Sequence, residues 1–159
     1  MKHYQAPWSR SLIIMSALGA VVCVGAAVGV TWSGRSWIAL LPLTILCGGI
    51  LFTIRGYSVA PDAILVHRLF WTTRLPLVRL ESAQFEPDAM RGSLRTFGNG
   101  GLFSFSGFYR NSSLGSYRAF VTDPHRTVVL HFPARTVVVS PSTPDDFVHD
   151  ICAATHANA

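Results

Sequence analysis

The segment from Gly115 to Ile151 reads GSYRAFVTDPHRTVVLHFPARTVVVSPSTPDDFVHDI, and its residue pattern changes from strands to a helix near its end. Residues 115–122, 127–132 and 136–140 are rich in β-branched and aromatic residues, and short proline-containing turns separate them. Such runs joined by short turns are typical of neighbouring strands. The pattern predicts three consecutive antiparallel strands.

The helix that follows has a recognisable start. Thr143 is a suitable N-cap, Pro144 suits the first helical position, and Asp145 and Asp146 would face the positive end of the helix dipole. We therefore interpret the two acids as helix-capping residues rather than as a catalytic pair. Apolar residues then recur at helical spacing and predict one stripe that packs on the sheet, formed by Phe147, Ile151 and Ala154.

Working towards the N-terminus, residues 57–85 read as further short strands. Pro76 interrupts the run 75–80, which predicts an edge strand or a broken strand. The expected order is a strand at 57–59, a strand at 64–69, a turn with bulky residues at 70–74, the edge strand, and a strand at 82–85.

The segment MRGSLRTFGNGGLFSFSGF, residues 90–108, contains five glycines and no acidic residue. Gly98 to Gly101 is a strong turn signal. Glycine-rich loops also hold phosphates, but neither GxxxxGK[ST] nor GxGxxG occurs here. The sequence therefore predicts a long flexible loop rather than a nucleotide site.

Two long apolar runs, SLIIMSALGAVVCVGAAVGVTW at 11–32 and WIALLPLTILCGGILFTI at 37–54, precede this region. Neither contains a charged residue, and each has about the length needed to cross a bilayer core of ~30 Å. The four-residue linker 33–36 leaves room only for a tight turn. These features predict a transmembrane hairpin over residues 11–55, with a cleaved signal peptide as the alternative for the first run.

Basic residues near the two runs indicate the orientation of the predicted hairpin. Lys2, Arg10, Arg55 and Arg68 flank its open end, whereas Arg35 alone lies in the turn. The positive-inside rule then places both termini in the cytoplasm of a multi-pass protein of the cell membrane. The expected organisation is a cytoplasmic tail at 1–10, the hairpin at 11–55, and one domain at 57–155.

Three residues are candidates for packing within the spans. Gly25 and Gly29 form a small-xxx-small pair that allows close helix contact, either inside the hairpin or in a dimer. Pro42 should kink the second span or leave a carbonyl free.

Charge and composition narrow the possible functions of the domain. The net charge is +5 over the 159 residues, but from Tyr57 onward nine arginines face eight acidic residues. The basic excess therefore flanks the spans, and nucleic-acid binding loses its main support. The three cysteines and six histidines form no spacing typical of a metal site. No nucleophile and base stand at a suggestive spacing, so we expect no catalytic residue, metal or cofactor.

Three stretches of the chain carry a family resemblance. The opening turn VAPDAIL at Val59–Leu65, the glycine-rich RTFGNGGLF at Arg95–Phe103 and the helix entry VSPSTPDDF at Val139–Phe147 are similar to those of bacterial pleckstrin-homology (PH) domains attached to two transmembrane helices. The resemblance implies a mainly-β, PH-like small antiparallel barrel or sandwich, capped by one C-terminal helix. It also implies a non-enzymatic module that binds lipid headgroups, peptides or proteins. Val59–Leu65 carries no Lys or Arg, so a phosphoinositide site at the first hairpin is not expected.

The first functional hypothesis is a membrane-anchored adaptor at the cytoplasmic face, which binds another membrane-associated protein or anionic lipid headgroups. Its candidate contact residues are the arginines of the acid-free segment, each able to contribute about 1 kcal/mol beside anionic lipid; the alternative is that they are ordinary solvated side chains. The second hypothesis is an accessory subunit of a membrane enzyme or transporter, recognised through its hairpin. The candidate arginines are Arg91, Arg95, Arg110 and Arg118.

Overall fold

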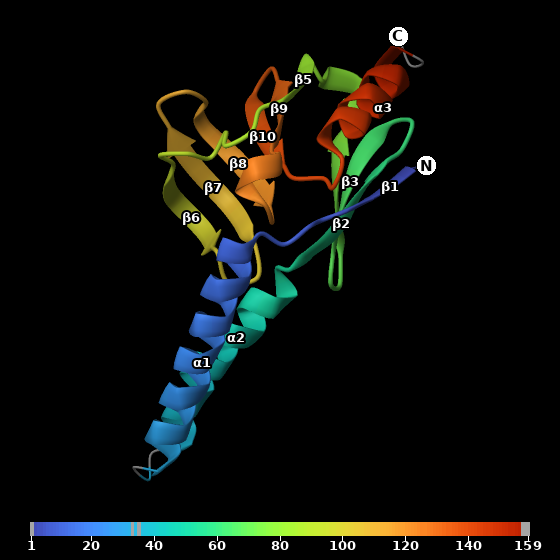
Figure 1. The fold of residues 1–159 in the computed structure, drawn as a ribbon. Coiled ribbons are helices and arrows are strands. Elements are labelled where there is room, and N and C mark those ends of the chain that lie inside the picture. Colours follow the sequence, from blue (N-terminus) through green and yellow to red (C-terminus); the bar gives the residue numbers. More distant parts are fainter. Residues whose placement is uncertain (1, 33, 35, 157–159) are drawn as a thin grey trace.

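A computed structural model describes residues 2–32, 34 and 36–156. A β-rich domain occupies one end of the molecule, and a pair of helices projects from it (Figure 1). Ser33 and Arg35 of the predicted turn lie outside the described residues, as does Met1.

The first sheet has four antiparallel strands in the order β1-β2-β3-β4. Pro76 lies in an edge strand as predicted, where a missing N–H is tolerated, but this strand ends at Pro76 instead of continuing to Leu80. The expected turn at 70–74 is partly wrong, because Thr72 to Arg74 pair with β3 and only residues 69–71 form the connection. A short 3₁₀ turn, Leu77–Arg79, follows. The strands are β1 (Lys2–Gln5), β2 (Ile54–Val59), β3 (Ala63–Arg68) and β4 (Thr72–Pro76).

Strand β1 was not predicted, because residues 1–10 read as a polar tail. It pairs with β2 in an antiparallel register from Lys2 opposite Val59 to Gln5 opposite Gly56. The Tyr4 side chain is buried and packs edge-on against Phe147. The segment before the helices is therefore an edge strand of the domain rather than a tail.

The second sheet has six strands in the order β5-β9-β10-β8-β7-β6. The predicted antiparallel pairing of β9 with β10 is confirmed. The predicted pairing of β8 with β9 is wrong, because β10 lies between them and runs parallel to β8. The reason is that Val137, Val138 and Val139 are all fully buried, which requires a central strand covered on both faces. The strands are β5 (Ser82–Phe85), β6 (Leu94–Gly100), β7 (Phe105–Asn111), β8 (Gly115–Val121), β9 (Val128–Phe132) and β10 (Arg135–Val139).

The glycine-rich segment is also different from its prediction, because it forms the β6–β7 hairpin rather than a long loop. Gly98 (φ +112°) faces Gly107 across the two strands, and a Cβ at Gly98 would lie 2.5 Å from the Ser106 carbonyl oxygen. The glycines therefore permit close strand pairing. The connection lies at residues 101–104, where the Asn99 side chain donates to the Leu102 carbonyl and accepts from its N–H.

The helix α3 (Pro144–His156) closes the domain as predicted. Phe147 and Ile151 are buried in the main core, which both sheets line, and Ala154 packs against it. The acids Asp145 and Asp146 lie in the first turn of the helix. This mostly-β domain of two sheets and one C-terminal helix is consistent with the PH-like fold that the sequence resembles.

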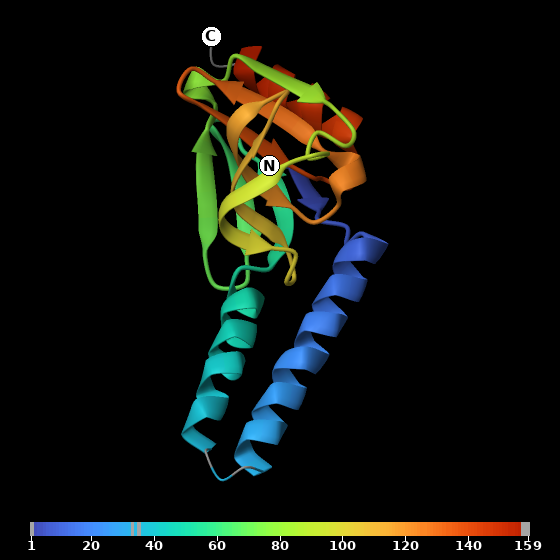
Figure 2. The ribbon, with the colours of Figure 1, turned by 90° about the vertical axis from the view of Figure 1, so that its left-hand side faces the viewer.

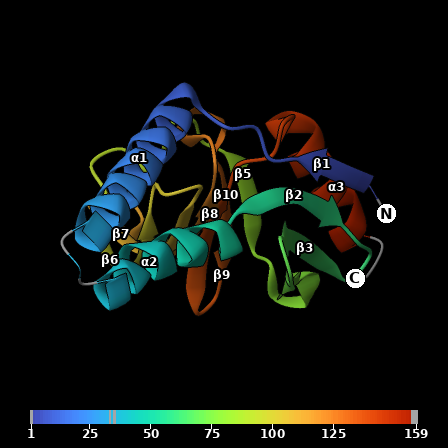
Figure 3. The same ribbon diagram turned by 90° about the horizontal axis from the view of Figure 1, so that it is seen from below.

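Helices α1 (Arg10–Trp32) and α2 (Leu40–Leu51) lie side by side (Figure 2), and a 3₁₀ turn, Ser36–Ala39, precedes α2. Within the described residues, α1 alone is long and apolar enough to cross a membrane, because the apolar helical segment Ser36–Leu51 is shorter. The second predicted span therefore ends early, and Ile54 belongs to β2. Seen from below, α2 leads directly into that strand (Figure 3).

The predicted packing residues do not join the two helices. A Cβ added at Gly25 or Gly29 would meet nothing within 4 Å among the described residues. Pro42 lies in the first turn of α2, directly after the 3₁₀ turn, where a helix needs no N–H from it. It therefore marks the start of α2 rather than a kink within it.

Candidate functional site

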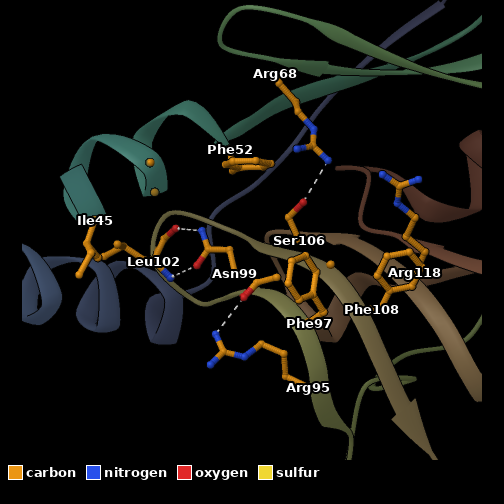
Figure 4. Close-up of a pocket in the computed structure, with 14 residues that line it drawn as sticks. Ile45, Phe52, Arg68, Arg95, Phe97, Asn99, Leu102, Ser106, Phe108 and Arg118 are labelled. Atoms are coloured by element: carbon orange, nitrogen blue, oxygen red, sulfur yellow. Dashed lines mark hydrogen bonds between the residues drawn. The ribbon is translucent and has the colours of Figure 1, made fainter. Parts of the chain in front are cut away.

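A pocket of about 580 Å³ lies where the helical pair joins the domain. One wall is the C-terminal half of α2, another is the end of β3, and the floor is the glycine-rich part of β6 and β7 (Figure 4). Its size is within the usual range for small-molecule sites. The pocket is therefore lined both by the apolar helix α2 and by strands of the β-rich domain.

Arg68 is the most unusual residue of this pocket. Its side chain is directed inward from the end of β3, and the residue is only 7% exposed. Nη2 donates to the Ser106 hydroxyl at 3.0 Å, whereas Nε has no hydrogen-bond partner among the described residues. Burial, together with the nearby charge of Arg118, lowers the pKa of Arg68 to about 10. Arg68 is therefore a buried cation that lacks an anionic partner among the residues that the structure describes.

Aromatic rings contact the guanidinium groups of Arg68 and Arg118. The Arg68 guanidinium carbon lies 5.1 Å from the centre of the Phe120 ring, and that of Arg118 lies 4.9 Å from the same centre. Phe52 and Trp71 also contact Arg68, at 5.3 and 5.5 Å. Such contacts favour a cation but neutralise no charge. The two arginines are therefore held near each other, and the described residues that line the pocket include no carboxylate.

The floor of the pocket is apolar and open. Phe97 and Phe108 face each other across β6 and β7, and both side chains are largely exposed, Phe97 by 76%. Arg95 lies at the rim and donates from Nη1 to the Gly98 carbonyl at 3.1 Å. The exposed rings give this side of the pocket an apolar surface that water solvates poorly.

The helical wall is fixed to the domain by the β6–β7 turn. Leu102 fills the space beside Gly49, where an added Cβ would lie 2.8 Å from its Cγ, and it also reaches Gly19 of α1. The Ser16 hydroxyl of α1 accepts a hydrogen bond from the Phe103 N–H at 2.9 Å. The Ser104 hydroxyl donates to the Phe52 carbonyl at 3.0 Å. These contacts hold the pocket wall in place.

The predicted arginine cluster is divided by the fold. Arg95 and Arg118 line the pocket, whereas Arg91 lines a separate cavity beside Asp88 and Arg110 is exposed on β7 outside both. Arg91 and Arg110 therefore do not join the other two at one site.

Arg68 was not predicted as a site residue, although the sequence contained a signal for it. Ile64 and Val66 alternate along β3 and are fully buried, and Arg68 continues that inward-facing series. A charged residue at an inward position of a strand requires a reason other than solvation.

The pocket offers anion binding next to an apolar surface. Three arginines line it, none of its lining residues is acidic, and none of the three forms a salt bridge within the described chain. Guanidinium groups bind phosphate and carboxylate by paired hydrogen bonds. Groups of three or more residues able to hold a metal are absent from the described part of the chain.

Comparisons with known proteins give one match. The family model described as "Bacterial PH domain" matches residues 55–154. The matched range runs from β2 to α3 and includes Arg68, Arg95 and Arg118. No curated protein and no solved structure matches the chain.

Proposed function

Because the chain belongs to the bacterial PH domain family, we propose that it is a membrane-anchored, non-catalytic binding module at the cytoplasmic face of the cell membrane. In this proposal α1 and α2 enter the bilayer as a hairpin, and the domain stays at the membrane surface. The pocket beneath Arg68 is the binding site for its ligand or partner.

The observation that carries this proposal is the pairing of β1 with β2. Strand β1 precedes the helical pair and β2 follows it, yet the two strands form one antiparallel ladder. Both ends of the helical pair must therefore lie on the same side of any membrane that the helices enter. Lys2, Arg10 and Arg55 lie at these ends, and such a basic bias favours the cytoplasmic side.

The surface of the helices supports a membrane location. Large apolar side chains of α1 and α2 are exposed along both helices, and such an extended apolar surface in water would promote aggregation. The shorter segment Ser36–Leu51 spans about 24 Å at 1.5 Å per residue, which is less than the ~30 Å of a bilayer core. Local thinning of the bilayer can accommodate this difference. Its exposed side chains include Leu40, Leu41, Leu43, Ile45 and Ile50.

Reporter fusions test the proposed topology. Reporters fused at the N-terminus and after Ala159 should both report the cytoplasm, and a reporter inserted at Gly34 should report the opposite side. The chain should also resist extraction from membranes at alkaline pH. A C-terminus on the outer side, or release of the protein by alkali, would contradict the proposal.

A second candidate function is that of an accessory subunit of a membrane enzyme or transporter. It is favoured by the open surface at Gly25, Gly29 and Gly48, where an added Cβ would meet no other described residue. Small residues of this kind allow another transmembrane helix to approach closely. Purification in mild detergent distinguishes the two functions, because an accessory subunit requires a stoichiometric membrane partner.

A further inference from the structure

We infer that the pocket binds an anionic phospholipid, with its phosphate between Arg68 and Arg118 and an acyl chain directed along α2 into the bilayer. This inference rests on the proposed membrane location, and it adds the chemical class of the ligand and its orientation. The family match assigns no ligand to these residues.

The positive charge of the pocket favours an anionic ligand. Arg68 is buried, and within the described chain its Nε has no hydrogen-bond partner and its charge has no counter-ion. The single hydrogen bond from Nη2 to Ser106 therefore offsets the loss of water only in part. The Arg118 guanidinium lies beside the same Phe120 ring and adds a like charge. A phosphate that accepts from both guanidinium groups would relieve the repulsion between them. We therefore expect the tightest binding from a ligand with a compact negative group.

The half of the pocket beside α2 favours an apolar chain. Ile45 and Leu102 lie on the side of the pocket away from Arg118, with Phe52 between them and Arg68 (Figure 4). Phe97 and Phe108 continue this apolar surface on the floor. A soluble phosphate compound would leave these apolar side chains exposed, whereas an acyl chain would cover them.

The position of the pocket makes such a lipid available. Ile45, Gly48 and Gly49 belong to α2, so the apolar end of the pocket opens beside the helical pair rather than at the far end of the domain. If the helices enter the bilayer, a lipid of the adjacent leaflet needs only to move its headgroup into the pocket. Its chain can stay in contact with α2 throughout.

The test uses the full chain in a neutral detergent and native mass spectrometry. The protein is titrated with dioleoyl phosphatidylglycerol, dioleoyl phosphatidylcholine or glycerol 3-phosphate, and the fraction of protein with one bound molecule is measured. We expect phosphatidylglycerol to bind at least ten-fold more tightly than either comparison compound. Equal binding of phosphatidylcholine would show that the charge is not recognised, and equal binding of glycerol 3-phosphate would show that the chain is not. Either result would overturn the inference.

Matched variants locate the binding. Arg118→Gln should weaken phosphatidylglycerol binding about ten-fold, because it removes one of the two phosphate contacts. Arg110→Gln is the control, since it removes the same charge from the neighbouring strand β7 outside the pocket, and it should change binding less than two-fold. An equal loss in both variants would indicate a general attraction to positive charge and would contradict a site.

Two further measurements keep the outcome clear. Phosphatidylglycerol should raise the melting temperature of the wild-type chain more than phosphatidylcholine does, which tests binding without any variant. The reporter fusions are scored separately. If both termini are cytoplasmic but phosphatidylglycerol is not preferred, the lipid inference fails while the proposed function stands. A C-terminus outside the cytoplasm would contradict the proposed function itself.

Discussion

Tyr57 connects the two sheets through one buried hydroxyl group. Its Oη donates to the Phe120 carbonyl at 2.6 Å and accepts from the Ser140 N–H at 3.3 Å. The side chain is fully buried, and burial raises its pKa to about 12, so the group is neutral over the physiological range. It therefore serves as a hydrogen-bond partner at the point where β2 meets β8 and β10.

Tyr57→Phe should lower the free energy of unfolding by about 1–3 kcal/mol, because it leaves buried backbone groups without a partner. Tyr117→Phe is the control, since among the described residues its hydroxyl bonds to the Ser93 side chain rather than to backbone groups. Thermal unfolding of both variants in detergent measures the difference. Equal losses in the two variants would mean that the Tyr57 hydroxyl has no special role.

Gly98 tests the origin of the tight β6–β7 pairing. Gly98→Ala should lower the free energy of unfolding by more than about 2 kcal/mol, because φ is +112° and the new Cβ would contact backbone. Gly25→Ala in α1 is the control and should not destabilise the protein, since its added Cβ meets nothing within 4 Å. A Gly98→Ala variant that melts like the wild type would contradict the hairpin geometry.

At the scale of elements, a histidine pair joins β1 to its neighbours. The Ser58 hydroxyl lies 3.0 Å from His3 Nδ1 and 2.8 Å from His67 Nε2, and the two imidazole rings are 5.5 Å apart. Burial lowers the pKa of His67 below its ordinary value of 6.5, and the nearby His3 lowers it further. Two protonated rings at this distance would repel each other, so β1 should be sensitive to acid.

The sign of this pH dependence follows from the direction of the shift. The unfolded chain takes up a proton at His67 near pH 6.5, whereas the folded chain does so only at a lower pH. The stabilisation is therefore complete above pH 6.5 and decreases as the pH falls below it. Hydrogen exchange of the β1 amides at pH 7.5 and 5.5, corrected for intrinsic rates, should show weaker protection at pH 5.5. His67→Gln should reduce that difference, and an unchanged difference would contradict this role.

Local sequence patterns predicted individual helices and strands better than they predicted which strands pair with each other. The stripe of Phe147 and Ile151 and the edge position of Pro76 could be predicted, because each depends on local periodicity or on one backbone N–H. The pairing of β10 with β8 could not be predicted from turn lengths, although the uninterrupted run Val137–Val139 indicates a central strand. Strand β1 has no apolar pattern, and its pairing depends on β2, fifty residues later.

The candidate site could be predicted only in part for the same reason. Arg95 and Arg118 were identified from an acid-free segment, but their partner Arg68 comes from β3, in a different sheet. The wall at Gly49 comes from a helix that the sequence presents only as a membrane span. Contacts between segments so distant in the chain are set by the packing of the two sheets and the helices.

At the scale of the whole molecule, the helical pair and the domain are packed as one unit. The β6–β7 turn extends along the first turns of α1, where Leu102 reaches Gly19 and the Phe103 N–H bonds to Ser16. If the helices enter a bilayer, this turn lies at the headgroup region. The pocket is therefore held at the depth where a lipid headgroup would be found.

Cysteine cross-linking in membranes tests this arrangement. With the native Cys23, Cys47 and Cys152 replaced by serine, the pair Gly49→Cys and Leu102→Cys should form an intramolecular disulfide under mild oxidation, because an added Cβ at residue 49 would lie 2.8 Å from Leu102 Cγ. The pair Gly25→Cys and Leu102→Cys is the control. Residue 25 lies six positions beyond Gly19 on α1, about 9 Å along the helix axis, so it should not cross-link. Mass spectrometry of the digested protein identifies the linked peptides. Efficient linkage of the control pair, or none at residue 49, would mean that the helices do not hold the domain in this position.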